Sequence, residues 1–212
     1  MKIVVNASGT LREEFLSRKI PLNTKIAAVE SVSCFPDHAD ASLFFDLEPL
    51  PEATETYRIL SPAPILVNSV TDVLARFSGI SNIGRVNAWP GMINRPLMEL
   101  VCKDPLTRKN IENCLQKLNW AYRLVPDIPG MVSARIISMI INEAYFAFGE
   151  KVSSREEIDI AMKSGTNYPF GPFEWTQKIG AREVVQLLQK MNEDNRRYNI
   201  APALLKEVQI SA

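Results

Sequence analysis

The segment from residue 126 to residue 188 constrains this chain most, because its turns and apolar spacings predict a succession of helices. It opens with Pro126-Asp127-Ile128-Pro129-Gly130, where two prolines and a glycine exclude a helix that continues through the turn. The apolar run 131–148 then predicts a long helix that is buried on most of its sides. Ser154-Arg155-Glu156-Glu157 has the pattern of a capping box, and the helix that it begins can stop at Gly165.

An aromatic turn, residues 168–175, follows this second helix. Its Pro172 suits the first position of a third helix, because proline has no amide hydrogen to lose there. Gly180 separates that short helix from a fourth, in which apolar residues recur at helical spacing as far as Met191. The C-terminal part of the chain is therefore predicted to be all-α.

The residues before 126 predict a different architecture, an α/β sheet. The expected strands are short and apolar: 2–5, 25–29, 43–47, 65–67, two within 85–102, and 120–125. Thr10 can begin a helix after the first strand, and Asp104-Pro105 can begin another. This alternation predicts a parallel sheet, with one domain over 1–126 and a helical domain over 127–212.

Charge and cysteine content exclude several classes of protein. Lys plus Arg and Asp plus Glu both total 24, so no net field favours nucleic acid or an acidic membrane surface. Cys34, Cys102 and Cys114 have no metal-binding spacing and indicate reduced thiols. The N-terminus has the pattern of a strand rather than of a signal peptide, and charged residues interrupt the most apolar helix. We therefore expect a cytoplasmic protein without a membrane span.

Three phrases carry a specific resemblance: PGMVSAR from Pro129, EEIDIAMKSGTNYPFGPFE from Glu156, and RRYNIAPALLKEV from Arg196. They resemble the C-terminal helical domain of 3-hydroxyacyl-CoA dehydrogenases over nearly all of residues 126–208. The resemblance implies an N-terminal NAD-binding Rossmann domain, a homodimer formed through the helical domain, and a place in fatty-acid metabolism. The chain is shorter than the family between Gly9 and Asp40, so the Rossmann-like domain is expected to be shortened.

The cofactor turn of this Rossmann-like domain departs from the family pattern. A dinucleotide site needs GxGxxG after the first strand, and here only Gly9 matches, with Ala7 and Arg12 at the other two positions. Glu30 follows Gly9 by 21 residues, roughly where an acid would bind the ribose, but a solvated carboxylate at a strand end is the favoured interpretation. We expect no cofactor, and NAD only if this remnant still binds it.

The resemblance also implies a catalytic set, which this chain has largely replaced. The family uses a histidine base, a glutamate that holds it, a serine and an asparagine. An ungapped alignment places Pro90 at the histidine, Cys102 at the glutamate and Ala134 at the asparagine. The serine survives as Ser69 or, in another register, as Thr71. Neither proline nor alanine can exchange a proton with substrate.

The remaining candidates have simpler interpretations. His38, the chain's single histidine, is expected in a surface loop between Asp37 and Asp40, which is not a metal motif. Arg95 and Lys103 could contact the phosphates of CoA or could simply be solvated.

Two further groups of residues leave alternatives open. Seven side chains could line an acyl or CoA pocket or fill the domain interface: Trp89, Met92, Trp120, Tyr168, Phe170, Phe173 and Trp175. Arg135, Ser138 and Asn142 share one helix face, which would be either a cleft remnant or a dimer-interface network.

These observations predict a 3-hydroxyacyl-CoA dehydrogenase-like pseudoenzyme that forms a homodimer and takes an acyl-CoA-type ligand. Two alternatives remain at this point. One is an active NAD-dependent oxidoreductase on a 3-hydroxyacyl-CoA or 3-hydroxy acid with a rearranged site. The other is a purely structural dimerisation module.

Overall fold

The computed structural model describes residues 1–194 and 196–210, and the chain divides into two compact units, 1–131 and 132–212. Asn195, Ser211 and Ala212, which belong to the predicted helical domain, lie outside the described residues. Each unit has its own core, and each is considered by itself.

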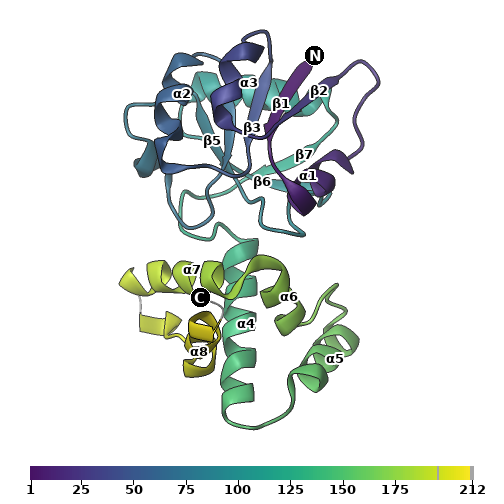
Figure 1. The fold of residues 1–212 in the computed structure, drawn as a ribbon, viewed down its shortest axis with the longest axis vertical. Helices are drawn as coiled ribbons and strands as arrows, with labels where there is room; N and C mark the ends of the chain where they lie inside the picture. Colours follow the sequence, from purple (N-terminus) through teal and green to yellow (C-terminus); the bar gives the residue numbers. More distant parts are fainter. Residues whose placement is uncertain (195, 211–212) are drawn as a thin grey trace. The chain divides into compact units, whose positions relative to one another are not determined.

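The first unit is built on a seven-stranded sheet in the order β2-β1-β3-β4-β5-β6-β7 (Figure 1). The strands are β1 (Lys2–Asn6), β2 (Lys25–Val29), β3 (Leu43–Asp46), β4 (Ile65–Asn68), β5 (Ile83–Val86), β6 (Leu97–Val101) and β7 (Ala121–Leu124). The five strands from β2 to β5 in this order are parallel, as predicted. β6 runs antiparallel to β5 and parallel to β7, which the sequence pattern did not indicate.

Helices cover both faces of this sheet. They are α1 (Gly9–Leu16), α2 (Thr54–Ile59), α3 (Pro105–Lys117) and the 3₁₀ segments η1 (Val32–His38), η2 (Pro51–Ala53) and η3 (Leu74–Phe77). One core joins Phe15 of α1 and Ile111 of α3 to the sheet, and the other joins Phe35 and Tyr57 to its opposite face. The unit is therefore a shortened Rossmann-like fold, which confirms the predicted fold class.

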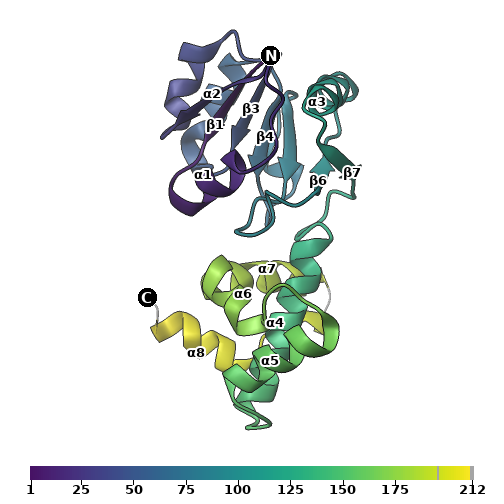
Figure 2. The same ribbon diagram turned by 90° about the vertical axis from the view of Figure 1, so that its right-hand side faces the viewer.

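The second unit is helical (Figure 2). It consists of α4 (Ser133–Gly149), α5 (Arg155–Thr166), α6 (Pro172–Ile179), α7 (Ala181–Asp194), η4 (Arg196–Tyr198) and α8 (Pro202–Ile210). α4 contacts α6, α7 and α8. Ser154 and Glu157 form the predicted capping box, and Pro172 begins α6 as predicted. α5 ends at Thr166 rather than at Gly165, because Asn167 takes the left-handed conformation, with φ 55°.

Two of the three polar residues on this face of α4, Ser138 and Asn142, are buried, and Asn142 and Arg135 bond within their own unit. The amide of Asn142 donates to the carbonyl of Asn199 at 2.8 Å and accepts from the amide of Ala201 at 2.9 Å. Arg135 donates to the Tyr198 hydroxyl at 2.7 Å. This face therefore binds the backbone and side chains that precede α8, while Ile136 of the same helix is 53% exposed. No helix among the described residues is long and apolar enough to cross a membrane.

Candidate functional site

Polar residues stand at the carboxyl ends of the parallel strands, where an open α/β sheet binds ligands. Asn6 ends β1, Asp46 ends β3, Ser69 follows β4 and Asn87 follows β5, and all four are buried. Their side chains lie at one edge of the sheet because the strands run in the same direction. We take this edge as the candidate site.

Ser69 begins a tightly bonded turn at this edge. Its hydroxyl donates to the carbonyl oxygen of Asp72 at 3.1 Å, and its own carbonyl accepts from Nε of Arg85 at 2.8 Å. Beside it, Asn68 donates to the carbonyl of Leu47 at 3.0 Å and accepts from the amide of Ala88 at 3.0 Å. The ends of β3, β4 and β5 are thereby held together around the predicted serine.

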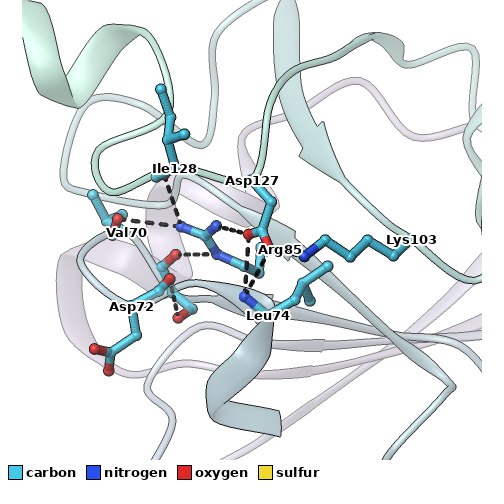
Figure 3. A network of polar contacts seen from close by, with 8 residues as sticks. Val70, Asp72, Leu74, Arg85, Lys103, Asp127 and Ile128 are labelled. Atoms are coloured by element: carbon cyan, nitrogen blue, oxygen red, sulfur yellow. Dashed lines mark hydrogen bonds and ion pairs between the residues drawn. The ribbon is translucent and has the colours of Figure 1, made fainter. Parts of the chain in front are cut away.

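A fully buried arginine, Arg85, is bonded to the turn that Ser69 begins, and Figure 3 shows its contacts with Val70, Asp127 and Ile128. The guanidinium of Arg85 forms an ion pair with Asp127 and donates to the carbonyl of Val70 at 3.3 Å. Asp127 also accepts from the amide of Leu74 at 3.1 Å and pairs with Lys103 at 2.8 Å. Lys103, one of the two candidate phosphate contacts, therefore has a structural partner.

The surroundings of Arg85 and Asp127 shift the pKa of both side chains. Burial lowers the pKa of Arg85, and the hydrogen bond and charge of Asp127 oppose that shift. Burial by itself would raise the pKa of Asp127. Hydrogen bonds from Lys103, the Leu74 amide and Arg85 outweigh burial and hold the pKa of this carboxyl below its usual range. Both groups are therefore charged at neutral pH, and the turn that carries Ser69 is anchored by an ion pair.

The strand registers place Ser69, Asn87 and Glu99 in one row across β4, β5 and β6. Asn68 pairs with Val86 in the parallel ladder, so Ser69 comes beside Asn87. Val86 pairs with Leu100 in the antiparallel ladder, so Asn87 comes opposite Glu99. Asn87 is 5% exposed, and its Nδ2 has no hydrogen-bond partner among the described residues. An amide in this place can donate a hydrogen bond but cannot accept a proton at neutral pH.

The structure does not bring Pro90 and Cys102 together. Pro90 lies beyond the carboxyl end of β5, whereas Sγ of Cys102 contacts the carbonyl of Ile83, at the amino end of that strand, at 3.6 Å. The two positions separate because β5 and β6 run in opposite directions. Burial raises the pKa of the Cys102 thiol to about 11, so this cysteine stays protonated at neutral pH. Asn87, which the sequence reasoning missed, could have been noticed as the polar residue directly after an apolar strand.

The turn after β1, where the family would bind its cofactor, is crossed by hydrogen bonds of Arg12. Gly9 is the first residue of α1, with φ 44°. Arg12 donates to the carbonyls of Ala7 at 2.7 Å and of Val29 at 3.3 Å, so its guanidinium spans the carboxyl ends of β1 and β2. Glu30 is an exposed partner of Arg12 at 3.8 Å.

Two contacts at this corner bear on the binding of a dinucleotide. The pyrophosphate of a dinucleotide needs free amides at the start of the first helix and a crevice beside the first two strands. Here the hydroxyl of Ser8, just before α1, donates to the carboxylate of Glu48 at 2.7 Å, which puts a negative charge where phosphate would lie. Arg12 bonds to the carbonyls of Ala7 and Val29, beside the ends of β1 and β2.

A second buried carboxylate lies at the same edge and was also missed. Asp46 accepts from the amide of Asn6 at 2.9 Å and from the hydroxyl of Tyr57 at 2.5 Å. Burial raises the pKa of Asp46. Burial and the charge of Asp46 also raise the pKa of the Tyr57 hydroxyl. These bonds tie α2 to the sheet and leave Asp46 with structural partners.

The other candidates lie away from this edge. His38 ends η1 shortly before β3 begins, at the amino edge of the sheet. Ala134 is fully buried in α4 of the second unit. Trp120, one of the possible pocket residues, packs against Phe15 and Phe45 inside the first core. Among the described residues, no cluster of three or more His, Cys, Asp or Glu side chains could hold a metal ion.

Comparison with known proteins identifies the family. The C-terminal domain of 3-hydroxyacyl-CoA dehydrogenases, as a sequence family, matches residues 130–211. The 3-hydroxyadipyl-CoA dehydrogenase of Escherichia coli is 40% identical over 88 residues, which are 42% of this chain and 18% of that protein. The 3-hydroxybutyryl-CoA dehydrogenase of Bradyrhizobium diazoefficiens is 32% identical over 149 residues, 66% of this chain and 48% of that protein. Residues 130–211 of this chain belong to the family of 3-hydroxyacyl-CoA dehydrogenase C-terminal domains.

The likeness to a solved member of the family extends over both units. (S)-3-Hydroxybutyryl-CoA dehydrogenase from Ralstonia eutropha gives a TM-score of 0.75 at 18% identity, with 99% of this chain and 94% of that chain covered. At this identity the likeness shows the fold. The chain spans less than half the length of the two curated relatives named above.

Proposed function

We propose that this 3-hydroxyacyl-CoA dehydrogenase homologue does not catalyse ordinary NAD-dependent dehydrogenation and keeps a binding or scaffolding role in acyl-CoA metabolism. The observation that carries the proposal is the row at the carboxyl edge of the sheet. Asn87 stands there between Ser69 and Glu99, and an amide cannot serve as the general base that removes a hydroxyl proton. The alternative position, Pro90, has no titratable group either.

The cofactor corner supports the same proposal independently. Arg12 spans the ends of β1 and β2, and Glu48 places its charge beside Ser8 at the start of α1. Both features oppose the binding of a pyrophosphate in the manner of a Rossmann domain. We therefore expect weak NAD binding or none.

We further propose that the protein is a homodimer formed through residues 127–212. The supporting observation is the start of α4, where Ile136 is 53% exposed and Val132, just before the helix, is 43% exposed. A stable interface of this kind buries on the order of 2,000 Å². Covering these apolar side chains with the same helix of a second copy would contribute to that area.

A combined assay tests the proposed function. NADH absorbance is followed with acetoacetyl-CoA in the reductive direction, beside calorimetry with NAD and separately with acetoacetyl-CoA. We expect no turnover, little NAD binding and measurable acyl-CoA binding. Turnover above about 1 s⁻¹, which lies in the usual range of enzymes, would contradict the proposal and favour the rearranged oxidoreductase. Binding of neither ligand would contradict the binding role and favour a structural module.

A further inference from the structure

A basic pocket lies in the first unit, at the end of α1, and neither Ser69 nor Asn87 lines it. It has a volume of about 650 Å³ and is lined by the segments 17–21, 94–96 and 118–121. These segments are the residues that follow α1, the loop that precedes β6 and the turn that leads into β7. We call it the Arg18 pocket.

Three cations and no acid line the Arg18 pocket. The cations are Arg18, Lys19 and Arg95, and the other lining residues carry no charge. The chain as a whole has a formal net charge of zero, so this concentration of positive charge is local. Glu14, an acid on α1 four residues before Arg18, is bound through both carboxylate oxygens to the amide of Gly91, at 2.9 and 2.7 Å. A pocket with this charge pattern attracts anions.

Arg18 is held rigidly at the wall of the pocket. Its Nη1 donates to the carbonyl of Ile93 and to that of Arg95, the latter at 3.0 Å. Its guanidinium lies 4.0 Å from the centre of the Trp120 ring, and Nε1 of that ring donates to the carbonyl of Lys19 at 2.9 Å. The planar cation is therefore pre-organised, which reduces the entropy lost when it binds a ligand.

The charge of Arg18 has no counter-ion among the described residues. Its bonding partners are neutral carbonyls, Nε is buried without a partner, and no described atom accepts from Nη2. Burial lowers the pKa of Arg18, and no carboxylate opposes that shift. Bracing the loop at Ile93 and Arg95 uses Nη1 of Arg18 and leaves Nη2 available to a ligand.

We propose that the Arg18 pocket binds a phosphate-bearing anion. Guanidinium groups bind phosphate through paired, charge-assisted hydrogen bonds, and Arg18 presents Nη2 for one of them. Lys19 and Arg95 supply further positive charge at the same pocket. Inorganic pyrophosphate and the nucleotide end of CoA share this chemistry. The residues that line this pocket are not those on which the proposed loss of dehydrogenase activity rests. Either proposal can therefore fail without the other.

Calorimetry on the full chain at low ionic strength tests this inference with three probes: inorganic pyrophosphate, CoA and pantetheine, which lacks phosphates. We expect pyrophosphate and CoA to bind through the pocket and their affinity to fall with added salt. Arg18→Gln should weaken pyrophosphate binding by at least about tenfold, because it removes a charge-assisted contact. The control is Lys109→Gln, an exposed cation on α3 that does not line the pocket.

If Arg18→Gln does not fold, the variants Lys19→Gln and Arg95→Gln test the same pocket. Each should weaken pyrophosphate binding, and neither should change pantetheine binding. No binding of pyrophosphate or CoA at millimolar concentration would overturn the proposal. An equal loss of pyrophosphate affinity in Lys109→Gln and in the pocket variants would also overturn the proposal. If pyrophosphate binds but CoA does not, the site takes a small phosphate rather than the coenzyme.

Discussion

The helical unit and the sheet unit of this chain differ in what their polar residues do. In the helical unit they complete helices: Ser154 and Glu157 cap α5, and Asp159 accepts from the amides of Phe173 and Glu174 at the start of α6. In the sheet unit the polar residues at the carboxyl edge bind one another, as Asp46 binds Asn6. Apolar patterning therefore specifies the fold, while the polar groups at the carboxyl edge of the sheet bond within the chain.

The largest effect is expected where the sheet unit depends on a buried charge. Arg85→Met leaves Asp127, which is 8% exposed, without its buried partner and should lower the free energy of unfolding by about 3–5 kcal/mol. Urea denaturation measures the change. The control is Arg76→Met, which breaks an exposed ion pair with Asp72 and should cost less than about 1 kcal/mol. Equal losses in the two variants would show that the buried network does not anchor the Ser69 turn.

A smaller effect is expected at the joint between α5 and α6. A Cβ built at Gly171 would lie 2.2 Å from Oδ1 of Asp159, so Gly171→Val should displace this capping carboxylate and cost about 1–3 kcal/mol. Gly165→Ala is the matched control, because nothing lies within 4 Å of its Cβ and it should stabilise α5 by about 0.5–1 kcal/mol. Melting of Gly171→Val at the wild-type temperature would refute the close contact.

The exposed face of α4 gives a prediction about assembly. Light scattering at micromolar concentration should show a dimer for the wild type and a monomer for Ile136→Glu, because the new charge would have to be buried in the interface. Ile59→Glu, an exposed apolar residue of the sheet unit, should leave the dimer intact. A wild-type monomer would contradict the proposed dimer.

The smallest effect concerns the pH dependence of the Asp127 network. The pKa of Asp127 is lower in the folded chain than in the unfolded chain. The ionised carboxylate therefore stabilises the folded state fully above the unfolded pKa, about 3.9. This stabilisation is lost as the pH falls through the folded pKa. The stability difference between wild type and Asp127→Asn should therefore narrow below pH 4, as measured by urea denaturation at several pH values. A difference that widens on acidification would contradict the sign of this shift.

Much of the fold could be predicted from the sequence, because local signals determine it. Nearby residues determine where each helix or strand forms. Examples are the capping box at Ser154, the proline at 172 and the short apolar runs of the strands. The resemblance over 126–208 identified the helical domain for the same reason. Ser69 was predicted correctly to follow a strand, because strand ends show in the apolar pattern.

The candidate site depended on contacts between distant residues, and the tertiary structure alone decided it. The antiparallel turn of β6 separates Pro90 from Cys102 and sets Asn87 opposite Glu99, which an ungapped alignment cannot express. The hydrogen bonds between the polar face of α4 and residues 198–201 likewise join residues that are distant in the sequence. The sequence determined which elements form because their signals lie within a few residues. Their partners depend on strand direction and register, which only the folded chain fixes.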